Sequence, residues 1–254
     1  MDMKVTYGEK FYSDMNDSNL SSARAVVPIV LDLVENTSSV IDIGSGRGLW
    51  LKAFLENGVE SVYGVDGSWV EEKDLVVPTE CFSSMELDKE FVVNKEANLA
   101  ISLEVAEHVP ESSAEHFINQ LTKTAPIVLF SAAIPGQGGT NHLNEQWPSY
   151  WEEKFKARGY IAVDAIRRKI WSNKDIAFFY SQNMFFFVKE TELQNYPKLK
   201  SEFEAGFDKC DSLVHPVLFE RTNEDAKRWK LIVPYMKYVP VSFLKQIKKF
   251  MSKN

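Results

Sequence analysis

One glycine-rich stretch, V-I-D-I-G-S-G-R-G-L-W over residues 40–50, constrains the fold of this chain more than any other feature. Residues 40–43 are apolar and β-branched apart from Asp42, which is typical of a strand buried on both faces of a parallel sheet. The glycines at alternate positions from Gly44 to Gly48 permit positive φ and a close approach of the backbone to a ligand. Residues 49–57 then have helical apolar spacing. The order strand, glycine turn, helix predicts a nucleotide-binding α/β unit.

Position 49 narrows the choice of ligand. The dinucleotide fingerprint G-x-G-x-x-G needs its third glycine there, to pack the helix under a pyrophosphate, and this chain has Leu49. A nucleoside ligand without phosphates is therefore favoured, with Asp42 placed to receive a cation. A second strand is expected over residues 61–65, and it ends at Asp66, where an acid can accept both ribose hydroxyls. The alternative is that the glycines only turn the chain.

These residues resemble the class I S-adenosylmethionine-dependent methyltransferases. In that family the glycine turn faces the methionine half of the cofactor, and the acid after the second strand holds the ribose. An acid with an apolar neighbour after the third strand takes the adenine amino group. Glu86-Leu87, in a third strand expected over residues 79–87, matches best, although Asp88 competes. Trp69 is interpreted either as a stacking partner of adenine or as simple packing.

The string S-L-E-V-A-E-H-V-P, residues 102–110, follows a fourth strand expected over residues 97–103. It is similar to the E-V-x-E-H of many small-molecule methyltransferases, and it lies at the carboxyl end of a strand, where α/β sheets bind ligands. The resemblance places Glu104 near the methionine moiety. His108 either caps and packs the next helix, or titrates near neutral pH and faces the acceptor. The expected cofactor-binding residues are Asp42, Gly44, Ser45, Gly46, Gly48, Asp66, Gly67, Trp69, Glu86, Leu87 and Glu104.

A long polar loop, residues 134–151, follows a fifth strand expected over residues 127–133. Loops of this length at a strand's carboxyl end are usually functional. The loop resembles those of methyltransferases that tailor sugars and other small metabolites, in which a histidine and an acid approach the acceptor. We expect His142 to act as the base and Glu145 to orient its ring, with His108 as the alternative base. The expected substrate-binding residues are Tyr12, Gln137, Asn141, Trp147, Trp151 and Trp171.

The predicted fold class is α/β: a Rossmann-like, seven-stranded, mostly parallel sheet with helices on both faces, plus a C-terminal helical extension. Residues 1–190 form the predicted methyltransferase domain, in which residues 1–36 supply a lid and a helix over residues 21–35. The resemblance implies that a seventh strand, residues 182–188, inserts antiparallel between the fifth and the sixth. Residues 191–254 form the extension. Its last expected helix, residues 242–251, is basic and amphipathic and suits contact with its own domain, a second subunit in a homodimer, or a membrane surface.

Composition limits the partners. The net charge of −7 gives no broad basic field for nucleic acid. The sequence contains no run of about 18 apolar residues, so membrane insertion is not expected. Cys81 and Cys210, two cysteines far apart, indicate a reducing, cytoplasmic setting. The four histidines are scattered without ligand spacing, so no metal is expected, although His142 and Glu145 could still serve a hard cation.

The predicted reaction is methylation of a small molecule, most simply a hydroxyl of a sugar, a nucleotide sugar or a capsule or polysaccharide precursor; a phosphoramidate group is a further candidate. Two alternatives belong to other classes. An NAD(P)-dependent oxidoreductase is opposed by Leu49, and a non-catalytic S-adenosylmethionine-binding protein is opposed by the loop that holds His142 and Glu145.

Overall fold

The structure is a computed structural model that describes the backbone of residues 9–236 and the side chains of residues 18–227. The chain divides into two compact units, residues 1–213 and 214–254, which are treated separately. The strands are β1 Ser39–Ile43, β2 Ser61–Asp66, β3 Phe82–Ser84, β4 Leu99–Leu103, β5 Ile127–Ser131, β6 Tyr160–Val163 and β7 Phe185–Lys189. The α-helices are α1 Glu9–Leu33, α2 Leu49–Glu56, α3 Ala114–Thr124, α4 Pro148–Lys156, α5 Arg167–Ile170, α6 Phe178–Asn183, α7 Pro197–Glu204 and α8 Pro216–Met236.

The seven strands form one sheet in the order β3-β2-β1-β4-β5-β7-β6. Strand β7 runs antiparallel to both β5 and β6, and every other neighbouring pair is parallel. This confirms the predicted seven-stranded, mostly parallel sheet. The carboxyl ends of β1, β2, β4 and β5 therefore meet at one edge, so that the glycine turn, Asp66, Glu104 and the long loop all leave the sheet on the same side.

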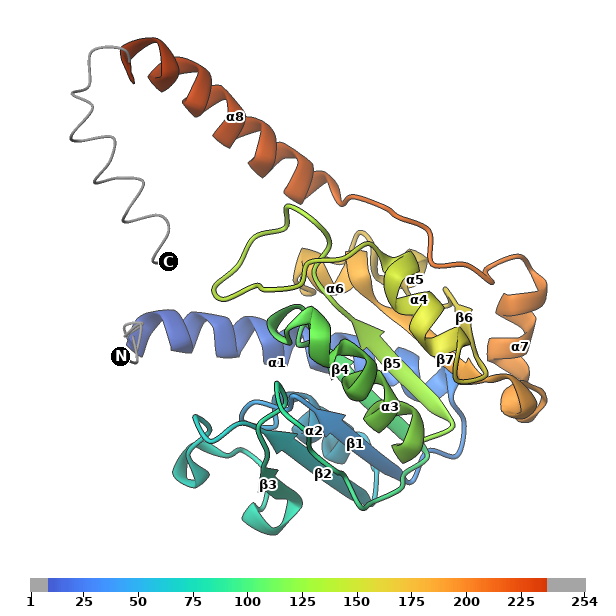
Figure 1. Cartoon of the computed structure of the whole chain (residues 1–254). Helices are drawn as coiled ribbons and strands as arrows, with labels where there is room; N and C mark the ends of the chain where they lie inside the picture. Colours follow the sequence, from blue (N-terminus) through green and yellow to red (C-terminus); the bar gives the residue numbers. More distant parts are fainter. Residues whose placement is uncertain (1–8, 237–254) are drawn as a thin grey trace. The chain divides into compact units, whose positions relative to one another are not determined.

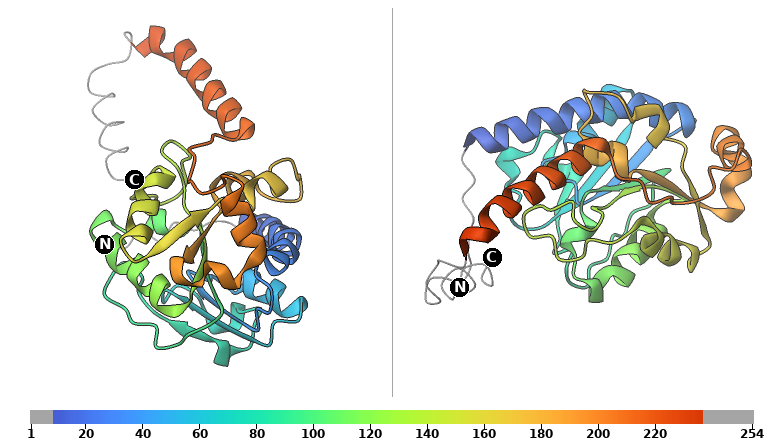
Figure 2. Two further views of the ribbon diagram at one scale, coloured as in Figure 1. Left: turned by 90° about the vertical axis from the view of Figure 1, so that its right-hand side faces the viewer. Right: turned by 90° about the horizontal axis from the view of Figure 1, so that it is seen from above.

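Helices cover both faces of the sheet (Figures 1 and 2). Alternate strand residues feed two separate cores, because successive side chains of a strand point to opposite faces. Val40 and Leu99 pack in one core with apolar residues of α1 and α2, whereas Ile41 and Ala100 pack in the other with residues of α3 and α4. Strands buried on both faces explain the near-continuous apolar runs in the sequence.

The first helix is longer than the helix predicted over residues 21–35. Helix α1 begins at Glu9, before the expected start at residue 21, and it continues through Pro28. Pro28 removes one backbone hydrogen bond, but it lies on the exposed face, where water can satisfy the freed carbonyl. The opposite face, including Ala23 and Val30, is fully buried and holds the helix on both sides of the proline. The expected lid residues 1–8 lie outside the described residues.

Strand β3 is shorter than the predicted residues 79–87. Thr79–Cys81 form a 3-10 turn, and only Phe82–Ser84 pair with β2, at the edge of the sheet. An edge strand has one neighbour, so its pairing ends where β2 ends at Asp66. Glu86 and Leu87 consequently lie in the loop beyond the strand.

Residues 191–213 belong to the first compact unit, although they were predicted to be part of the C-terminal extension. Leu199 of α7 is fully buried in the core that also holds α1, and Asp164 donates its backbone N–H to the carbonyl of Phe207 at 2.9 Å. The second unit contains α8. The expected helix over residues 242–251, and with it the predicted dimer contact, lies outside the described residues. Within the described part of the chain, no helix is both long and apolar enough to cross a membrane.

Candidate active site

The glycine turn between β1 and α2 has the conformation that its sequence predicts. Gly44, Gly46 and Gly48 all have positive φ, at 92°, 51° and 86°. The N–H groups of Gly44 and Ser45 donate to the carbonyl of Val65 at 2.8 and 3.1 Å, which ties the turn to β2. No atom lies within 4 Å of the position that a Cβ on Gly46 would take. The turn therefore leaves its backbone open toward one side, as a ligand cradle requires.

Asp66, the last residue of β2, connects this turn to the next loop. Its Oδ2 accepts the N–H of Gly46 at 2.6 Å, and its Oδ1 accepts the N–H of Gly67 at 2.7 Å. The side chain is buried, which raises its pKa, and the two amide hydrogen bonds counter part of that increase. An ionised carboxylate has about four acceptor sites, so lone pairs remain for ribose hydroxyls. The Trp69 ring covers Gly67 and is 67% exposed, so one face is open to a ligand.

Two further acids lie near this edge. Burial, together with the charge of Asp66, raises the pKa of Asp42 well above its usual range. A cation bound beside Asp42 would restore its ionised form. Glu86 accepts hydrogen bonds from the hydroxyl and the N–H of Ser68 at 2.7 and 3.3 Å, which lower its pKa and join the loops that follow β2 and β3. The neighbouring Leu87 is buried in the core.

Glu104, just after β4, is held by carboxamides. It has a left-handed φ of 58°, its Oε2 accepts from Gln137 at 2.8 Å, and its Oε1 accepts from Asn183 at 3.0 Å. Gln182 and Asn183 also donate to the Oε1 of Gln137, at 3.2 and 2.9 Å. Burial raises the pKa of Glu104, opposed by these hydrogen bonds.

Gln182 and Asn183 were not among the predicted site residues, because both were expected in the last strand. They instead end α6. The available signal was the polar pair immediately before the apolar residues 184–188.

A single carboxylate organises the long loop after β5. Glu145 accepts the N–H groups of Gly136 and Gly138, each at 2.8 Å, and lies 2.8 Å from Nδ1 of His142. Burial works to raise the pKa of Glu145, but these hydrogen bonds outweigh it and lower the pKa. An ionised carboxylate can only accept, so His142 carries its proton on Nδ1 and leaves Nε2 free.

The rings of His108 and His142 make an edge-to-face contact, with centroids 4.9 Å apart and an interplanar angle of 89°. His108 Nδ1 lies 3.2 Å from the carbonyl oxygen of Asn141, which can only accept, so here too Nδ1 carries the proton. The surrounding protein, and then the charge of His142, lower the pKa of His108. The structure thus brings together the residues that the sequence analysis gave as base and alternative base.

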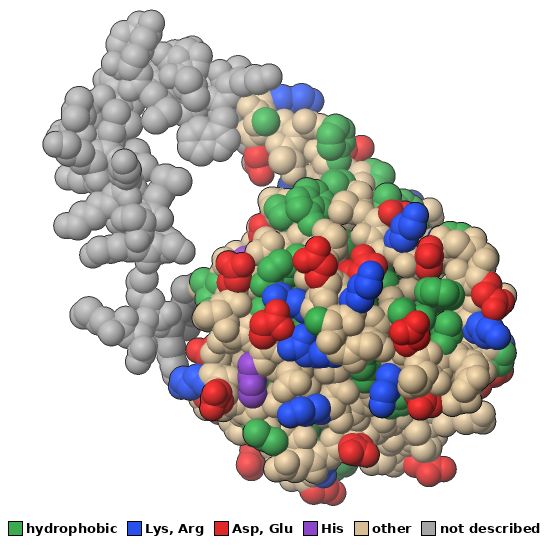
Figure 3. Space-filling model, turned by 45° about the vertical axis from the view of Figure 1, so that its right-hand side comes forward, with side chains coloured by type: hydrophobic (Ala, Val, Ile, Leu, Met, Phe, Trp, Pro, Cys, Tyr) green, Lys and Arg blue, Asp and Glu red, His purple; other side chains and the backbone are tan. Residues whose placement is uncertain are grey.

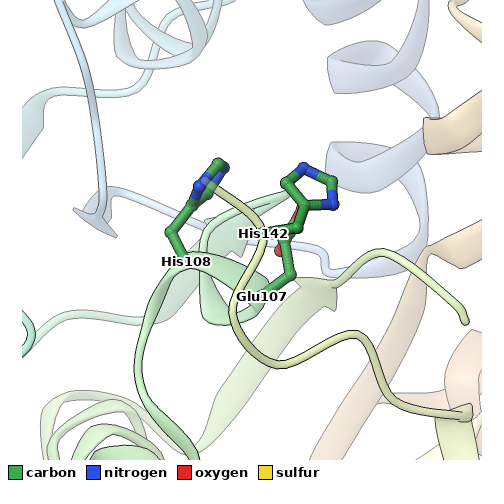
Figure 4. Close-up of side chains that lie close together, drawn as sticks. All are labelled: Glu107, His108 and His142. Atoms are coloured by element: carbon green, nitrogen blue, oxygen red, sulfur yellow. The ribbon is translucent and has the colours of Figure 1, made fainter. Parts of the chain in front are cut away.

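Glu107 lies beside the two histidines (Figure 4). Its backbone carbonyl accepts the N–H groups of Leu143 and Asn144 at 2.8 and 2.9 Å, which fastens the loop to the segment after β4. Its side chain is 1% exposed and its Oε2 has no hydrogen-bond partner. Burial, then the charge of Glu104, raise the pKa of Glu107 well above its usual range. Glu107, His108 and His142 each offer a ligand atom, and these atoms lie within 4.8 Å of one another.

The expectation that no metal binds rested on the spacing of histidines along the chain. His142 comes from a loop that is distant in sequence but adjacent in space to Glu107 and His108. The spacing of histidines along the chain therefore carries no information about this group of three residues.

The residues expected to bind the substrate are dispersed. Asn141 lies beside His108, whose Nδ1–H it accepts with its carbonyl, and Gln137 lies in the amide network around Glu104. Trp147 is 42% exposed where α4 begins, and Trp171 is half-buried after α5. Trp151 needs a correction: it is 2% exposed, with its ring centroid 5.4 Å from that of Phe130 in the core, so it cannot contact an acceptor in this conformation. The side chain of Tyr12 is outside the described side chains.

The sheet order, the open glycine turn and the acid at the tip of β2 define a class I S-adenosylmethionine-dependent methyltransferase. The chain belongs to the methyltransferase domain family, whose sequence profile matches residues 20–174. A comparison with curated protein sequences finds no match.

Solved structures of methyltransferases share the fold at low sequence identity. DesVI of Streptomyces venezuelae aligns with a TM-score of 0.52 at 12% identity, over 71% of this chain and 95% of its own. The sugar N-methyltransferase KedS8 of a Streptoalloteichus species aligns with 0.53 at 12% identity, over 74% and 98%. CalS10, an amino pentose methyltransferase of Micromonospora echinaspora, aligns with 0.52 at 10% identity, over 74% and 100%.

Proposed function

We propose that this methyltransferase acts on a hydroxyl of a sugar, a nucleotide sugar or a capsule or polysaccharide precursor, phosphoramidate-bearing precursors included. The observation that carries the proposal is the pair formed by His142 and Glu145, which stands beside His108 at the ligand edge of the sheet. A hydroxyl must lose its proton as it is methylated, whereas a neutral amine attacks with a free lone pair. The histidine pair therefore favours an oxygen acceptor, and the sugar-methylating structures of the same fold support a sugar.

The cofactor side of the proposal follows the geometry around the glycine turn. Gly44, Gly46 and Gly48 would receive the methionine half, and Asp66 would accept the ribose hydroxyls. Asp42 would balance a positive charge of the ligand, and the ring of Trp69 could cover the adenine. When bound, S-adenosylmethionine supplies a methyl group already activated by the sulfonium charge, so the protein mainly has to hold the acceptor in line.

On the acceptor side, His142 assists the loss of the hydroxyl proton, and Glu145 holds the ring in one tautomer and stabilises its positive charge. Such assistance contributes about 10²–10⁴-fold to the rate. The amide network around Glu104 anchors the loop that carries this pair, because Gln137 belongs both to the network and to the loop.

A small acceptor suits the surface of the molecule. Basic and acidic side chains are interspersed on the face drawn in Figure 3, so this face offers no broad basic area to a nucleic acid. The proposal includes a reducing, cytoplasmic setting, which the two free thiols of Cys81 and Cys210 support.

The test is a transfer assay with methyl-labelled S-adenosylmethionine against sugars, nucleotide sugars and their amino-sugar counterparts. We expect label on a hydroxyl, and transfer slower by at least about a hundredfold when His142 is replaced by alanine. Calorimetry with S-adenosylhomocysteine, NAD and NADP is the companion measurement. Label transferred only to amines would contradict the oxygen acceptor.

A further inference from the structure

Three side chains from two segments meet beside the acceptor loop, and we call them the Glu107–His108–His142 cluster. Glu107 and His108 belong to the 3-10 turn Ala106–His108 that follows β4, and His142 comes from the loop that follows β5. Figure 4 shows the three side chains gathered at this point. Their ligand atoms lie within 4.8 Å of one another.

Both histidines are oriented as metal ligands are. A metal-binding imidazole almost always donates its second N–H to a carboxylate or a backbone carbonyl, which fixes the tautomer and the ring. Nδ1 of His142 bonds to the Glu145 carboxylate at 2.8 Å, and Nδ1 of His108 bonds to the Asn141 carbonyl at 3.2 Å. Each ring therefore has Nε2 left over for a ligand.

Glu107 supplies a second, independent observation. Its side chain is 1% exposed, and its Oε2 is buried without a hydrogen-bond partner. An orphaned buried oxygen is rare and calls for an explanation, of which an ion is one. The neighbouring Glu104 makes a useful contrast, because amides of Gln137 and Asn183 occupy both of its oxygens. Of these two acids, only Glu107 has a buried oxygen without a partner.

We propose that the Glu107–His108–His142 cluster binds one divalent first-row transition-metal ion, represented by Zn²⁺. Two imidazoles and one carboxylate are the donor set that such ions prefer, whereas Mg²⁺ and Ca²⁺ prefer oxygen ligands throughout. Bonds of 2.0–2.2 Å in a tetrahedral site put ligand atoms about 3.4 Å apart. The cluster would thus close by small side-chain rotations, and three protein ligands leave a fourth position open.

The consequence for catalysis rests on the proposed function. His108 is an exposed residue and the cluster borders the acceptor loop, so the open position is accessible to a substrate hydroxyl. An ion there would make that hydroxyl more acidic. The two histidines would then assist as ligands of the ion, and the hydroxyl proton would pass to solvent water, which reaches the site beside the exposed His108.

The experiment is a calorimetric titration of tag-free, chelator-treated full-length protein with Zn²⁺ alone. We expect one site per chain, and at least a tenfold weaker site in Glu107→Gln and in His142→Ala. Glu111→Gln is the matched control: it removes the same charge four residues away at an exposed position and should bind Zn²⁺ like the parent. Co²⁺ gives a second readout, because its visible ligand-field bands should appear in the parent and be lost in Glu107→Gln.

Each outcome decides the proposal. Absence of binding by the parent, or equal binding by parent and Glu107→Gln, would overturn it, the latter showing adventitious binding only. Retained S-adenosylhomocysteine binding by the variants confirms that they are folded. Neither titration contains methyl donor or acceptor, so the metal site is tested separately from the proposed function. Absence of metal binding together with intact methyl transfer would refute the metal site and leave the proposed function standing. A metal site without transfer to any hydroxyl refutes the proposed function alone.

Discussion

Nδ1 of His142 lies 2.8 Å from Oε1 of Glu145, three residues along the same loop. The side chains are only 12% and 20% exposed, so the contact is shielded from much of the screening that weakens surface ion pairs. Because the same carboxylate also holds the backbone of Gly136 and Gly138, the shape of the loop and the tautomer of the histidine depend on one residue.

Replacing His142 by alanine should lower turnover by at least about a hundredfold and leave S-adenosylmethionine affinity nearly unchanged, because the ring serves the acceptor and not the cofactor. Glu145→Gln should cost less, since the ring remains. Steady-state kinetics and calorimetry measure the two effects. Parental turnover in His142→Ala combined with loss of activity in His108→Ala would show that the roles of the two histidines are reversed.

Gly139→Ala should lower turnover without weakening cofactor binding. A Cβ at position 139 would lie 2.1 Å from Nε2 of His142, so the ring would have to move away from its place beside His108. We expect an unchanged melting temperature and unchanged S-adenosylhomocysteine binding, which separate a displaced histidine from a damaged fold. Parental turnover in this variant would mean that the orientation of His142 is not needed.

Asp66→Ala should weaken S-adenosylmethionine binding by about 1–3 kcal/mol, a factor of roughly 5 to 150, since two ribose hydroxyls and two backbone amides lose an acceptor. Gly46→Val should weaken it as well, because φ is 51° there and the side chain would fill the open side of the turn. Glu72→Ala, at an exposed position in the loop after β2, is the control and should bind like the parent. Parental affinity in both site variants would disprove the cofactor site.

Asp42→Asn should stabilise the ligand-free protein at neutral pH. Burial raises the folded-state pKa of Asp42 well above its usual value of 3.8, so the folded state holds a proton that the unfolded state releases. The protein is therefore expected to lose stability as the pH rises from about 4 through the raised pKa that Asp42 has in the folded state. Urea denaturation at several pH values should show a smaller loss over this window in Asp42→Asn, together with weaker S-adenosylmethionine binding. An identical pH profile in the variant would contradict this.

Arg167→Met should destabilise the first unit by about 3 kcal/mol, because it leaves Asp164 and two backbone carbonyls without their donor. Arg167 is 1% exposed, bonds Asp164 at 2.6 Å and donates to the carbonyls of Gln182 and Asp211. Its neighbour Arg168 has a side chain that is 48% exposed, and Arg168→Met should change stability little. Urea denaturation compares the free energies of unfolding of the two variants. Equal losses in both would contradict a stabilising role of the buried Arg167.

Local sequence determined the sheet and the cofactor edge of this protein. Three features were sufficient for this prediction: the β-branched runs, the three glycines after β1 and the acid that ends β2. They act through backbone conformation and through the order of neighbouring residues, so a pattern along the chain reveals them. The α1 start and the length of β3 were predicted incorrectly, because each depends on packing: α1 on its buried face on either side of Pro28, and β3 on the single neighbour of an edge strand.

Only the tertiary structure decided which polar side chains meet. Asn183 reaches Glu104, and Gln182 reaches Gln137, because α6 ends where β7 enters the sheet between β5 and β6. Trp151 turns into the core because α4 packs on β5. His142 joins Glu107 and His108 across more than thirty residues of chain, through backbone hydrogen bonds from the loop to Glu107 that no local pattern encodes. Spacing along the chain specifies neighbours within one element, whereas the acceptor side of this site is assembled from separate elements by packing.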